Sequence, residues 1–214
     1  MKITKVVRQK KNKMRFSVFL DGRYGFSVSE ENLLKLGLRN GQDIDEQALA
    51  SIAVDEENRK ALDSVFRLLA VRNRSRKELT TRLKLKKLSK SSIDAALGRI
   101  KEIGYLDDAK YARERINYLR RSGKGPAYIR MDLRKAGIDE ETISELLTAT
   151  PESRAEEVEQ IKNIALSRLK RMSKTDPLTA SRKLTGFLAR RGFDIETIKD
   201  GLKAAKMEIE EQQE

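Results

Sequence analysis

Three stretches of this chain can be laid over one another without a gap, and this feature constrains the fold more than any other. The alignment starts from Leu79, Ile129 and Leu184, so the repeat spacings are 50 and 55 residues. Self-similarity at such a period is typical of arrays in which each unit packs mainly against its neighbours. The equivalent positions further along are Leu83, Leu133 and Leu188; Lys87, Gly137 and Gly192; Leu88, Ile138 and Phe193; Ser89, Asp139 and Asp194; Ile93, Ile143 and Ile198; and Leu97, Leu147 and Leu202.

Each copy has the pattern of two helices joined by a tight turn. In two copies a glycine, Gly137 or Gly192, ends one helix, and an aspartate two residues later caps the next. The first copy has Lys87 in place of the glycine, so we expect an irregular helix end there. A preceding helix completes each unit, at about 57–72, 108–122 and 154–172. The sequence therefore predicts three three-helix repeats.

The segment before the repeats has a different pattern. Apolar residues alternate on both sides of Asp21-Gly22, which is a strong hairpin signal, and Lys2–Val7 is a plausible third strand. Ser29 then caps a short helix that ends at Gly37. A β-containing element of about 50 residues buries little by itself, so we expect it to dock on the helical region next to it.

These signals predict a mainly α-helical protein. Its tandem three-helix repeats would form an elongated, curved array, with a small N-terminal domain that contains a β-hairpin. The expected domains are residues 1–54 for the β-containing domain, 55–106 and 107–150 for the first two repeats, and 151–214 for the third. The last of these ends in the acidic tail "MEIEEQQE", which we interpret as a frayed helix end.

Two adjacent acids, Asp107 and Asp108, could be read as a catalytic or metal-binding pair. They come after the helix stop at Gly104 and directly precede "AKYARERINYLRR", where an N-cap and a first-turn acid belong. No other carboxylate or histidine converges on them by spacing. We therefore interpret them as capping residues, and we expect Tyr105 and Leu106, just before the cap, to be buried as in a hydrophobic staple. Ser75 and Glu78 similarly predict a capping box.

Several kinds of chemistry find no support in the sequence. The chain has no cysteine and no histidine, which removes disulfides, the commonest general base and the usual nitrogen ligand of zinc. No phosphate-binding GxxxxGK[ST] loop occurs, and "SGKGPAYI" is better interpreted as a flexible hinge before Pro126 than as a nucleotide site. No apolar run approaches the roughly 20 residues of a membrane helix, and the start lacks the apolar stretch of a signal peptide. We expect a cytoplasmic protein that is not an enzyme and holds no cofactor and no metal.

The net charge is the strongest functional signal. The 46 Lys+Arg residues exceed the 33 Asp+Glu residues, giving a formal charge of +13. The excess is +2 in residues 1–56, +10 in 57–150 and +1 in 151–214, so it is concentrated in the first two repeats. Such clustering indicates a polyanionic partner, most often nucleic acid. Tyr111, Tyr118 and Tyr128 could stack on bases, although their helical spacing fits core positions at least as well.

Several motifs of the chain resemble those of a known family. The run "AVRNRSRKELTTRL", then "GYLDDAKYA", then a basic helix and "IRMDLRKAGID" are similar to the RecX regulatory proteins, over roughly residues 57–208. The front segment resembles an extension found on some members, and the third repeat departs most, with a longer first helix and near-neutral charge. The resemblance implies a modulator of the RecA recombinase, commonly an inhibitor, acting in homologous recombination and DNA repair. Family members lie in the groove of the RecA filament on single-stranded DNA and suppress ATP hydrolysis and strand exchange.

We therefore expect a monomer that binds the RecA filament and single-stranded DNA, weakly also double-stranded DNA, without sequence preference and without a membrane partner. Two alternatives remain open. One is a stand-alone DNA-binding protein of architectural or repressor type, since "SRKELTTRLKLKKLSKSSIDAAL" can be read as a helix-turn-helix; the other is an RNA-binding accessory factor. The expected nucleoprotein-binding residues form a basic face, consisting of Arg72, Arg74, Arg76, Lys77, Arg82, Arg113, Arg120, Arg121, Lys124, Arg130 and Arg134.

Overall fold

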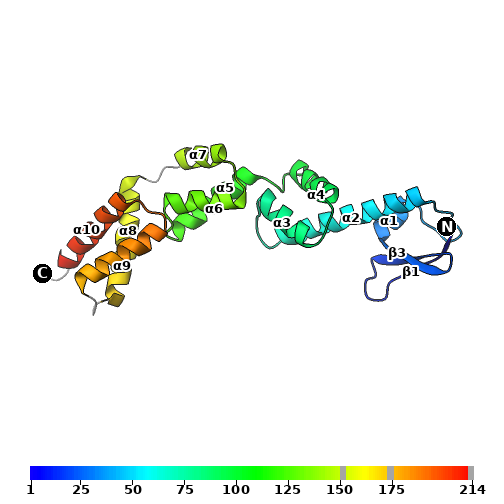
Figure 1. Ribbon diagram of the computed structural model, residues 1–214, viewed down its shortest axis with the longest axis horizontal. Coiled ribbons are helices and arrows are strands. Elements are labelled where there is room, and N and C mark those ends of the chain that lie inside the picture. The colour runs from blue at the N-terminus through cyan, green and yellow to red at the C-terminus, as the bar shows by residue number, and fades with distance from the viewer. Residues whose placement is uncertain (150–152, 173–175, 212–214) are drawn as a thin grey trace. The chain divides into compact units, whose positions relative to one another are not determined.

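The computed structural model describes residues 1–149, 153–172 and 176–211. In this part of the chain there are three β-strands and ten α-helices, so the protein is mainly helical, as predicted (Figure 1). The chain divides into two compact units, residues 1–106 and 107–214. The finer division at 54 and 150, and the curved arrangement of the repeats, stay predictions. No helix among the described residues is both long and apolar enough to cross a bilayer.

A three-stranded antiparallel sheet opens the first unit. Its strands are β1 (Ile3–Arg8), β2 (Arg15–Leu20) and β3 (Arg23–Ser29), in the order β1-β2-β3. Both residues of the predicted turn have positive φ, 47° at Asp21 and 82° at Gly22. This conformation matches the right-handed twist of the flanking strands, which is why Asp-Gly favours a hairpin. The hairpin and the additional strand are thus confirmed.

The small domain docks on a long helix, as expected. Helix α1 (Glu30–Lys35) is capped by Ser29, and α2 spans Glu46–Leu69. The first helix of repeat 1 was expected at about 57–72, so that expectation placed its start too late. Asp45 caps α2 by accepting a hydrogen bond from the backbone N–H of Ala48 at 2.7 Å, and the early turns bury Ile52 in the core of the small domain. One helix therefore belongs to both the small domain and the first repeat.

A carboxylate on α2 anchors the small domain. Glu56 accepts hydrogen bonds from the backbone N–H and the hydroxyl of Ser29, both at 2.8 Å, and from the amide of Asn32 at 2.9 Å. Arg15 of β2 donates to the same carboxylate at 2.9 Å. Glu56 thereby joins the sheet and the N-terminus of α1 to the long helix.

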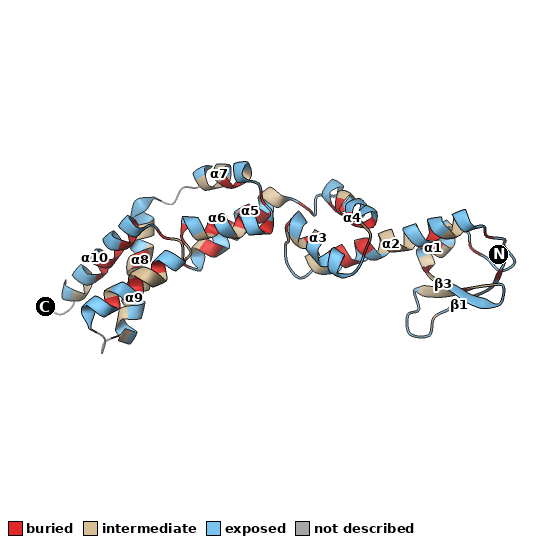
Figure 2. Ribbon diagram, viewed as in Figure 1, coloured by how far each residue is buried: buried red, intermediate tan, exposed pale blue. Residues whose placement is uncertain are grey.

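Each repeat consists of three helices around its own core. In Figure 2 the buried residues lie on the facing sides of these helices. The first repeat consists of the C-terminal half of α2, α3 (Arg76–Leu85) and α4 (Lys90–Glu102). The other two consist of α5 (Asp108–Arg121), α6 (Pro126–Ala136) and α7 (Glu140–Ala149), and of α8 (Arg154–Leu169) with a 3₁₀ turn (Lys170–Met172), α9 (Pro177–Arg190) and α10 (Ile195–Glu211). Residues 212–214 of the acidic tail lie outside the described residues.

The aligned apolar positions all contribute to these cores. All of them are buried except Leu147, which is partly buried against the core of repeat 2. An ungapped alignment has this result only if the three units share one packing pattern, so the repeat is confirmed. The buried members are Leu79, Ile129 and Leu184; Leu83, Leu133 and Leu188; Leu88, Ile138 and Phe193; Ile93, Ile143 and Ile198; and Leu97 and Leu202.

The turn between the second and third helix is also the same in each repeat. Lys87, Gly137 and Gly192 all have left-handed backbone conformations, with φ of 57°, 86° and 88°. Lys87 therefore adopts the conformation of the two glycines, despite the steric cost for a residue with a Cβ. Two residues later comes an N-cap each time, for example Asp139, which accepts a hydrogen bond from the backbone N–H of Thr142 at 2.8 Å.

The residues before α5 were only partly predicted. Asp107 is the N-cap of α5 and accepts a hydrogen bond from the backbone N–H of Lys110 at 2.9 Å, while Asp108 lies in the first turn. Leu106 is buried, as expected. Tyr105 is 64% exposed, so its expected burial was wrong. It instead packs edge-on against the ring of Phe66, with ring centroids 6.2 Å apart.

Within the second unit, two glycines join repeat 2 to repeat 3. Gly125 donates its N–H to the carbonyl of Arg191 at 2.8 Å, and Ala127 donates to the carbonyl of Gly192 at 3.1 Å. A Cβ on Gly125 would lie 2.5 Å from the Gly192 oxygen, and a Cβ on Gly192 would lie 2.2 Å from the nitrogen of Tyr128. The expected flexible hinge is therefore a close-packed junction. Pro126 occupies the first turn of α6, as predicted.

Candidate nucleic-acid interface

The predicted basic residues of the first unit lie on α3 and on the turn before it. Two of them are held by the fold. Arg72 makes two hydrogen bonds to the carboxylate of Glu78, at 2.8 and 3.1 Å, and Arg74 is half-buried with its Nε donating to the carbonyl of Leu68 at 3.2 Å. These side chains brace the turn that connects α2 to α3. The Ser75 hydroxyl accepts a hydrogen bond from the backbone N–H of Glu78, which is the serine half of the predicted capping box.

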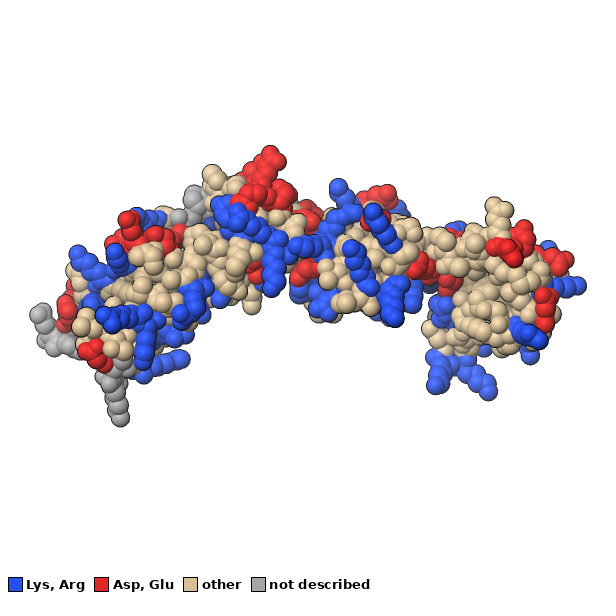
Figure 3. Space-filling view, viewed as in Figure 1, with Lys and Arg blue, Asp and Glu red and all other residues tan. Residues whose placement is uncertain are grey.

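The other basic residues around α3 point into solvent. Arg76, Lys77 and Arg82 are exposed, and in the described part of the chain Lys77 and Arg82 make no ion pair. Helix α3 buries only Leu79 and Leu83, which leaves most of its circumference for charged side chains. Figure 3 shows Lys and Arg side chains gathered on this part of the first unit.

In the second unit, α5 has a clear division between two faces. Its buried residues, Tyr111, Ala112, Ile116 and Leu119, follow helical spacing toward the core. Arg113 and Arg121 are exposed, lie eight positions apart and so share the opposite face, and neither makes an ion pair among the described residues. Lys110 belongs to this face too; its spacing of three from Arg113 is the signal that could have identified it. Arg120 is half-buried, and its carbonyl accepts a hydrogen bond from Gln160 of α8 at 2.9 Å.

The remaining predicted cations lie on or near α6 and have partners. Lys124 lies 4.1 Å from the centroid of the Tyr128 ring. Arg130 and Arg134 both pair with Glu140, at the start of α7, and the Nε of Arg134 donates at 2.6 Å. The hydrogen bond from Arg134 is the main cause that lowers the pKa of Glu140 and raises that of Arg134. Glu140 therefore neutralises a part of the expected basic face.

The structure distinguishes the three tyrosines that were candidates for stacking. Tyr111 is buried and Tyr128 is half-buried beneath Lys124. Tyr118 is 61% exposed, and the guanidinium of Arg115 lies 5.5 Å from its ring centroid. Asp132 holds Arg115 by two hydrogen bonds, at 2.8 and 3.0 Å. Of the three rings, only that of Tyr118 offers an open surface.

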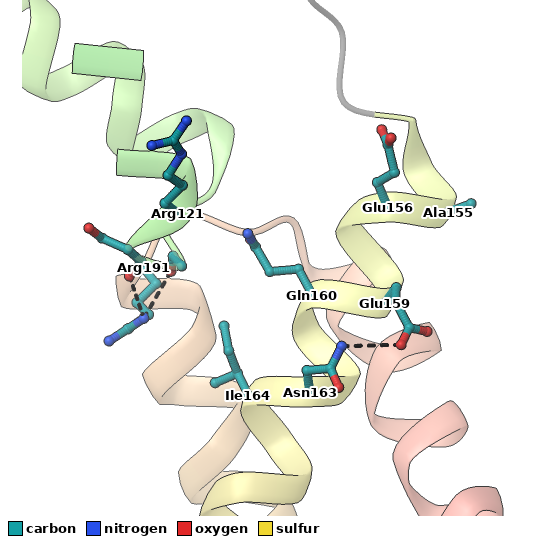
Figure 4. Close-up of a pocket in the computed structure, with 10 residues that line it drawn as sticks. Arg121, Ala155, Glu156, Glu159, Gln160, Asn163, Ile164 and Arg191 are labelled. Atoms are coloured by element: carbon teal, nitrogen blue, oxygen red, sulfur yellow. Dashed lines mark hydrogen bonds between the residues drawn. The ribbon is translucent and has the colours of Figure 1, made fainter. Parts of the chain in front are cut away.

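A pocket of the second unit lies where repeat 2 meets repeat 3. Its volume is about 780 Å³, and its lining includes Arg121 of α5 and, from α8, Gln160 and Ile164 (Figure 4). Arg191 donates to the carbonyls of Ser122 and Gly123, both at 3.0 Å, so its guanidinium fastens the two repeats together. No group of three or more metal-binding side chains occurs within the described residues.

Family comparisons match four segments of the chain in order. These are the "Regulatory protein RecX N-terminal domain" at residues 1–45, and the first, second and third three-helix domains of RecX at residues 61–99, 107–147 and 155–202. The matches cover the small domain and all three repeats. The chain belongs to the RecX family.

Individual RecX proteins agree with this assignment. The "Regulatory protein RecX" of Bacillus licheniformis is 33% identical over 96% of this chain and 78% of its own length, and that of Bacillus subtilis is 31% identical over 99% and 80%. A solved RecX structure superposes with a TM-score of 0.65 at 29% identity, covering 93% of this chain and 98% of the other. RecX from Lactobacillus salivarius has the same fold, with a TM-score of 0.60 at 21% identity over 72% of this chain and 99% of its own.

Proposed function

We propose that this RecX-family protein regulates the RecA recombinase by binding the RecA filament on single-stranded DNA, and that it inhibits ATP hydrolysis and strand exchange. Four exposed cations with no ion pair among the described residues carry the proposal: Lys77 and Arg82 on α3, and Arg113 and Arg121 on α5. Binding to a phosphate costs an unpaired cation little free energy, whereas a paired cation must first break its contact with a carboxylate.

Seven residues of the predicted basic face then fall into two functional groups. Lys77, Arg82, Arg113 and Arg121 act as phosphate contacts, together with Lys110. The other group has internal partners, and its main role is to stabilise the repeats; it consists of Arg72, Arg74 and Arg130. Phosphate contact by such residues is independent of base sequence and sensitive to salt.

Repetition supplies the second part of the mechanism. Each three-helix repeat has its own core, so one chain presents several similar contact surfaces in series. Several weak contacts to neighbouring RecA protomers add up to a large avidity, because every contact after the first is effectively intramolecular. A chain that bridges protomers in this way holds the filament in a state that hydrolyses ATP and exchanges strands poorly. It acts by binding, without catalysis of its own and without a cofactor.

The test is a titration of the full-length protein into RecA assembled on single-stranded DNA with ATP. We expect ATPase activity and strand exchange to fall, and Lys77→Glu with Arg82→Glu, or Arg113→Glu with Arg121→Glu, to raise the concentration needed at least ten-fold. The matched control is Lys199→Glu with Lys203→Glu, two exposed lysines of α10 in the near-neutral third repeat. Unchanged ATPase and strand exchange with saturating folded protein contradict the proposal.

The same preparations test the stand-alone DNA-binding alternative. A regulator that depends on RecA binds DNA alone weakly and without sequence preference. A repressor instead prefers its site over random DNA by a factor of about a thousand or more. Competition between random and selected duplexes, with no RecA present, separates the two.

A further inference from the structure

A basic loop in the first unit lies outside the predicted face. Residues 9–14, "QKKNKM", connect β1 to β2, and main-chain hydrogen bonds from Gln9 to Arg15 and from Arg15 to Asn12 close the turn. The lysines of this loop, Lys10, Lys11 and Lys13, are all exposed and make no ion pair with any described residue. Figure 3 shows basic side chains projecting from this edge of the small domain.

One face of α2 lies opposite this loop. The spacing of Arg59, Lys60, Asp63, Phe66 and Arg67 places them on a single side of the helix. Together with Asn12 and Arg15 they line a groove of about 650 Å³. The groove is thus formed by segments more than 40 positions apart in the sequence, and four of its seven lining residues are cationic.

The cations of the groove are not equivalent. Arg15 is held by Glu56, and Arg59 pairs with Glu31 and, at 3.9 Å, with Asp63. Lys60 is exposed without an ion pair in the described residues. The Nε of Arg67 donates to the main-chain carbonyl of Asp63 at 3.2 Å, which orients the side chain and keeps its positive charge.

Exposed aromatic rings accompany these charges. Phe66 lines the groove and is 41% exposed, although its helical spacing fits a core position. Tyr105 lies against it with an interplanar angle of 79°, and it is the more exposed of the two. Single-stranded nucleic acid can use exposed rings beside cations, because bases stack on the rings and phosphates contact the charges.

We propose that this groove is a binding site for single-stranded nucleic acid. Lys60 and Arg67, about 10 Å apart along α2, contact successive phosphates of the nucleic-acid backbone. The flexible lysine side chains of the loop contact the same backbone from the other side of the groove. A base stacks on Phe66. Duplex bases are already stacked inside the helix and cannot use the ring, which is why a single strand fits better. The proposal concerns nucleic acid without RecA, so it is independent of the proposed regulation.

The experiment measures binding of a labelled oligothymidylate to the full-length protein by fluorescence anisotropy, without RecA. We expect Lys60→Glu with Arg67→Glu to weaken binding at least ten-fold, and to reduce the magnitude of the salt slope by about 0.7 for each phosphate that is no longer neutralised. Serine substitutions at Lys10, Lys11 and Lys13 have a similar effect and do not touch the core. The matched control is Lys5→Glu with Arg23→Glu, two exposed cations of the same sheet that do not line the groove.

Phe66→Leu tests the stacking. It keeps an apolar side chain on α2 and removes the π-face, so we expect binding of oligothymidylate to fall about ten-fold while binding of a duplex of equal length stays unchanged. Thermal unfolding verifies that each variant is folded. The proposal is overturned if the groove and loop variants bind oligothymidylate like the wild type. It is also overturned if polyglutamate competes equally well and Phe66→Leu has no effect, because the groove then fits an acidic protein segment.

RecA assays on the same variants keep the two proposals apart. Loss of oligothymidylate binding with undiminished inhibition of RecA supports the groove and leaves the proposed regulation standing. Loss of inhibition in the α3 and α5 variants, with normal binding in the groove variants, supports the regulation and overturns the groove.

Discussion

Glu56 and Glu57 are consecutive on α2, and each accepts hydrogen bonds from the N-terminal cap of a different helix. Glu56 accepts from Ser29, the N-cap of α1, and Glu57 accepts from the backbone N–H of Ser89 at 2.9 Å and from its hydroxyl at 2.5 Å. Ser89 is the N-cap of α4. The two carboxylates thus hold the small domain and the first repeat to different sides of one helix.

This pair predicts a stability that depends on pH. Burial raises the pKa of Glu56, but the hydrogen bonds from Ser29 and Asn32 and the charge of Arg15 outweigh it, so the pKa is lowered. The hydrogen bonds from Ser89 and Ser92 lower the pKa of Glu57. A carboxylate with a lowered folded-state pKa stabilises the fold above its usual pKa of 4.5, and this contribution is lost as the pH falls through the lowered value.

We therefore expect Glu56→Gln and Glu57→Gln each to reduce the free energy of unfolding by about 1–2 kcal/mol at neutral pH, and by less at about pH 3. Urea unfolding followed by circular dichroism at several pH values measures this. Glu46→Gln, an exposed carboxylate in the first turn of α2, is the control. An equal loss at both pH values for the Glu56 and Glu57 variants contradicts the assignment.

Lys87 offers a stabilising substitution. Its φ of 57° costs a residue with a Cβ about 1 kcal/mol, a cost that the glycines of the other repeats avoid. We expect Lys87→Gly to raise the free energy of unfolding by about 0.5–1 kcal/mol, and Gly137→Ala to lower it by a similar amount. Thermal unfolding of the two variants checks the opposite signs, and a loss of stability in Lys87→Gly refutes the explanation.

Because the junction of repeats 2 and 3 is closely packed, we expect an alanine substitution to cost more stability at a junction glycine than at a glycine elsewhere. Gly104→Ala introduces a Cβ into open space at a φ of 77°, so it costs about 1 kcal/mol. Gly192→Ala has the same backbone penalty and also forces the Cβ against Tyr128, so we expect a loss of about 2 kcal/mol or more. Equal losses in chemical unfolding experiments would mean that the junction opens easily and that its close packing is unimportant.

Because Glu140 pairs with two arginines, we expect its neutralisation to strengthen binding to single-stranded DNA. Glu140→Gln releases Arg130 and Arg134, so we expect binding to single-stranded DNA to strengthen up to about five-fold at low salt. Glu141→Gln changes the net charge equally, and Glu141 is exposed without an ion pair in the described residues. Anisotropy titrations of the two variants isolate the effect of releasing the arginines. If both variants gain equally, only net charge matters.

The repeats could be predicted from the sequence because their signals are local. Positions such as Leu83 and Ile93 recur at helical spacing, and the N-cap at Asp139 lies next to the helix it begins. The start of α2 was missed because its early turns pack against the sheet, and only the tertiary structure reveals that contact. The burial of Tyr105 was predicted wrongly because a staple pattern identifies a position beside a helix without saying what covers it.

For the basic face, the sequence predicted only that cationic residues are numerous, and not which of them have carboxylate partners. Counting charges cannot tell that Arg72 is bound by Glu78 or that Glu140 takes two arginines, because each pairing depends on how neighbouring helices meet. The groove beside α2 was missed for the same reason. Its loop and its helix are distant in the sequence, and neither segment contains a recognisable motif.

The seam at Gly125 and Gly192 determines which substitutions the second unit tolerates. Main-chain groups of Gly125 and Ala127 form two of its hydrogen bonds, and the side chains of Arg191 and Gln160 add further ones. Surface charge away from these residues can therefore change without loosening the attachment of repeat 3 to repeat 2. At the two glycines, in contrast, any side chain would collide with the main chain of the facing repeat.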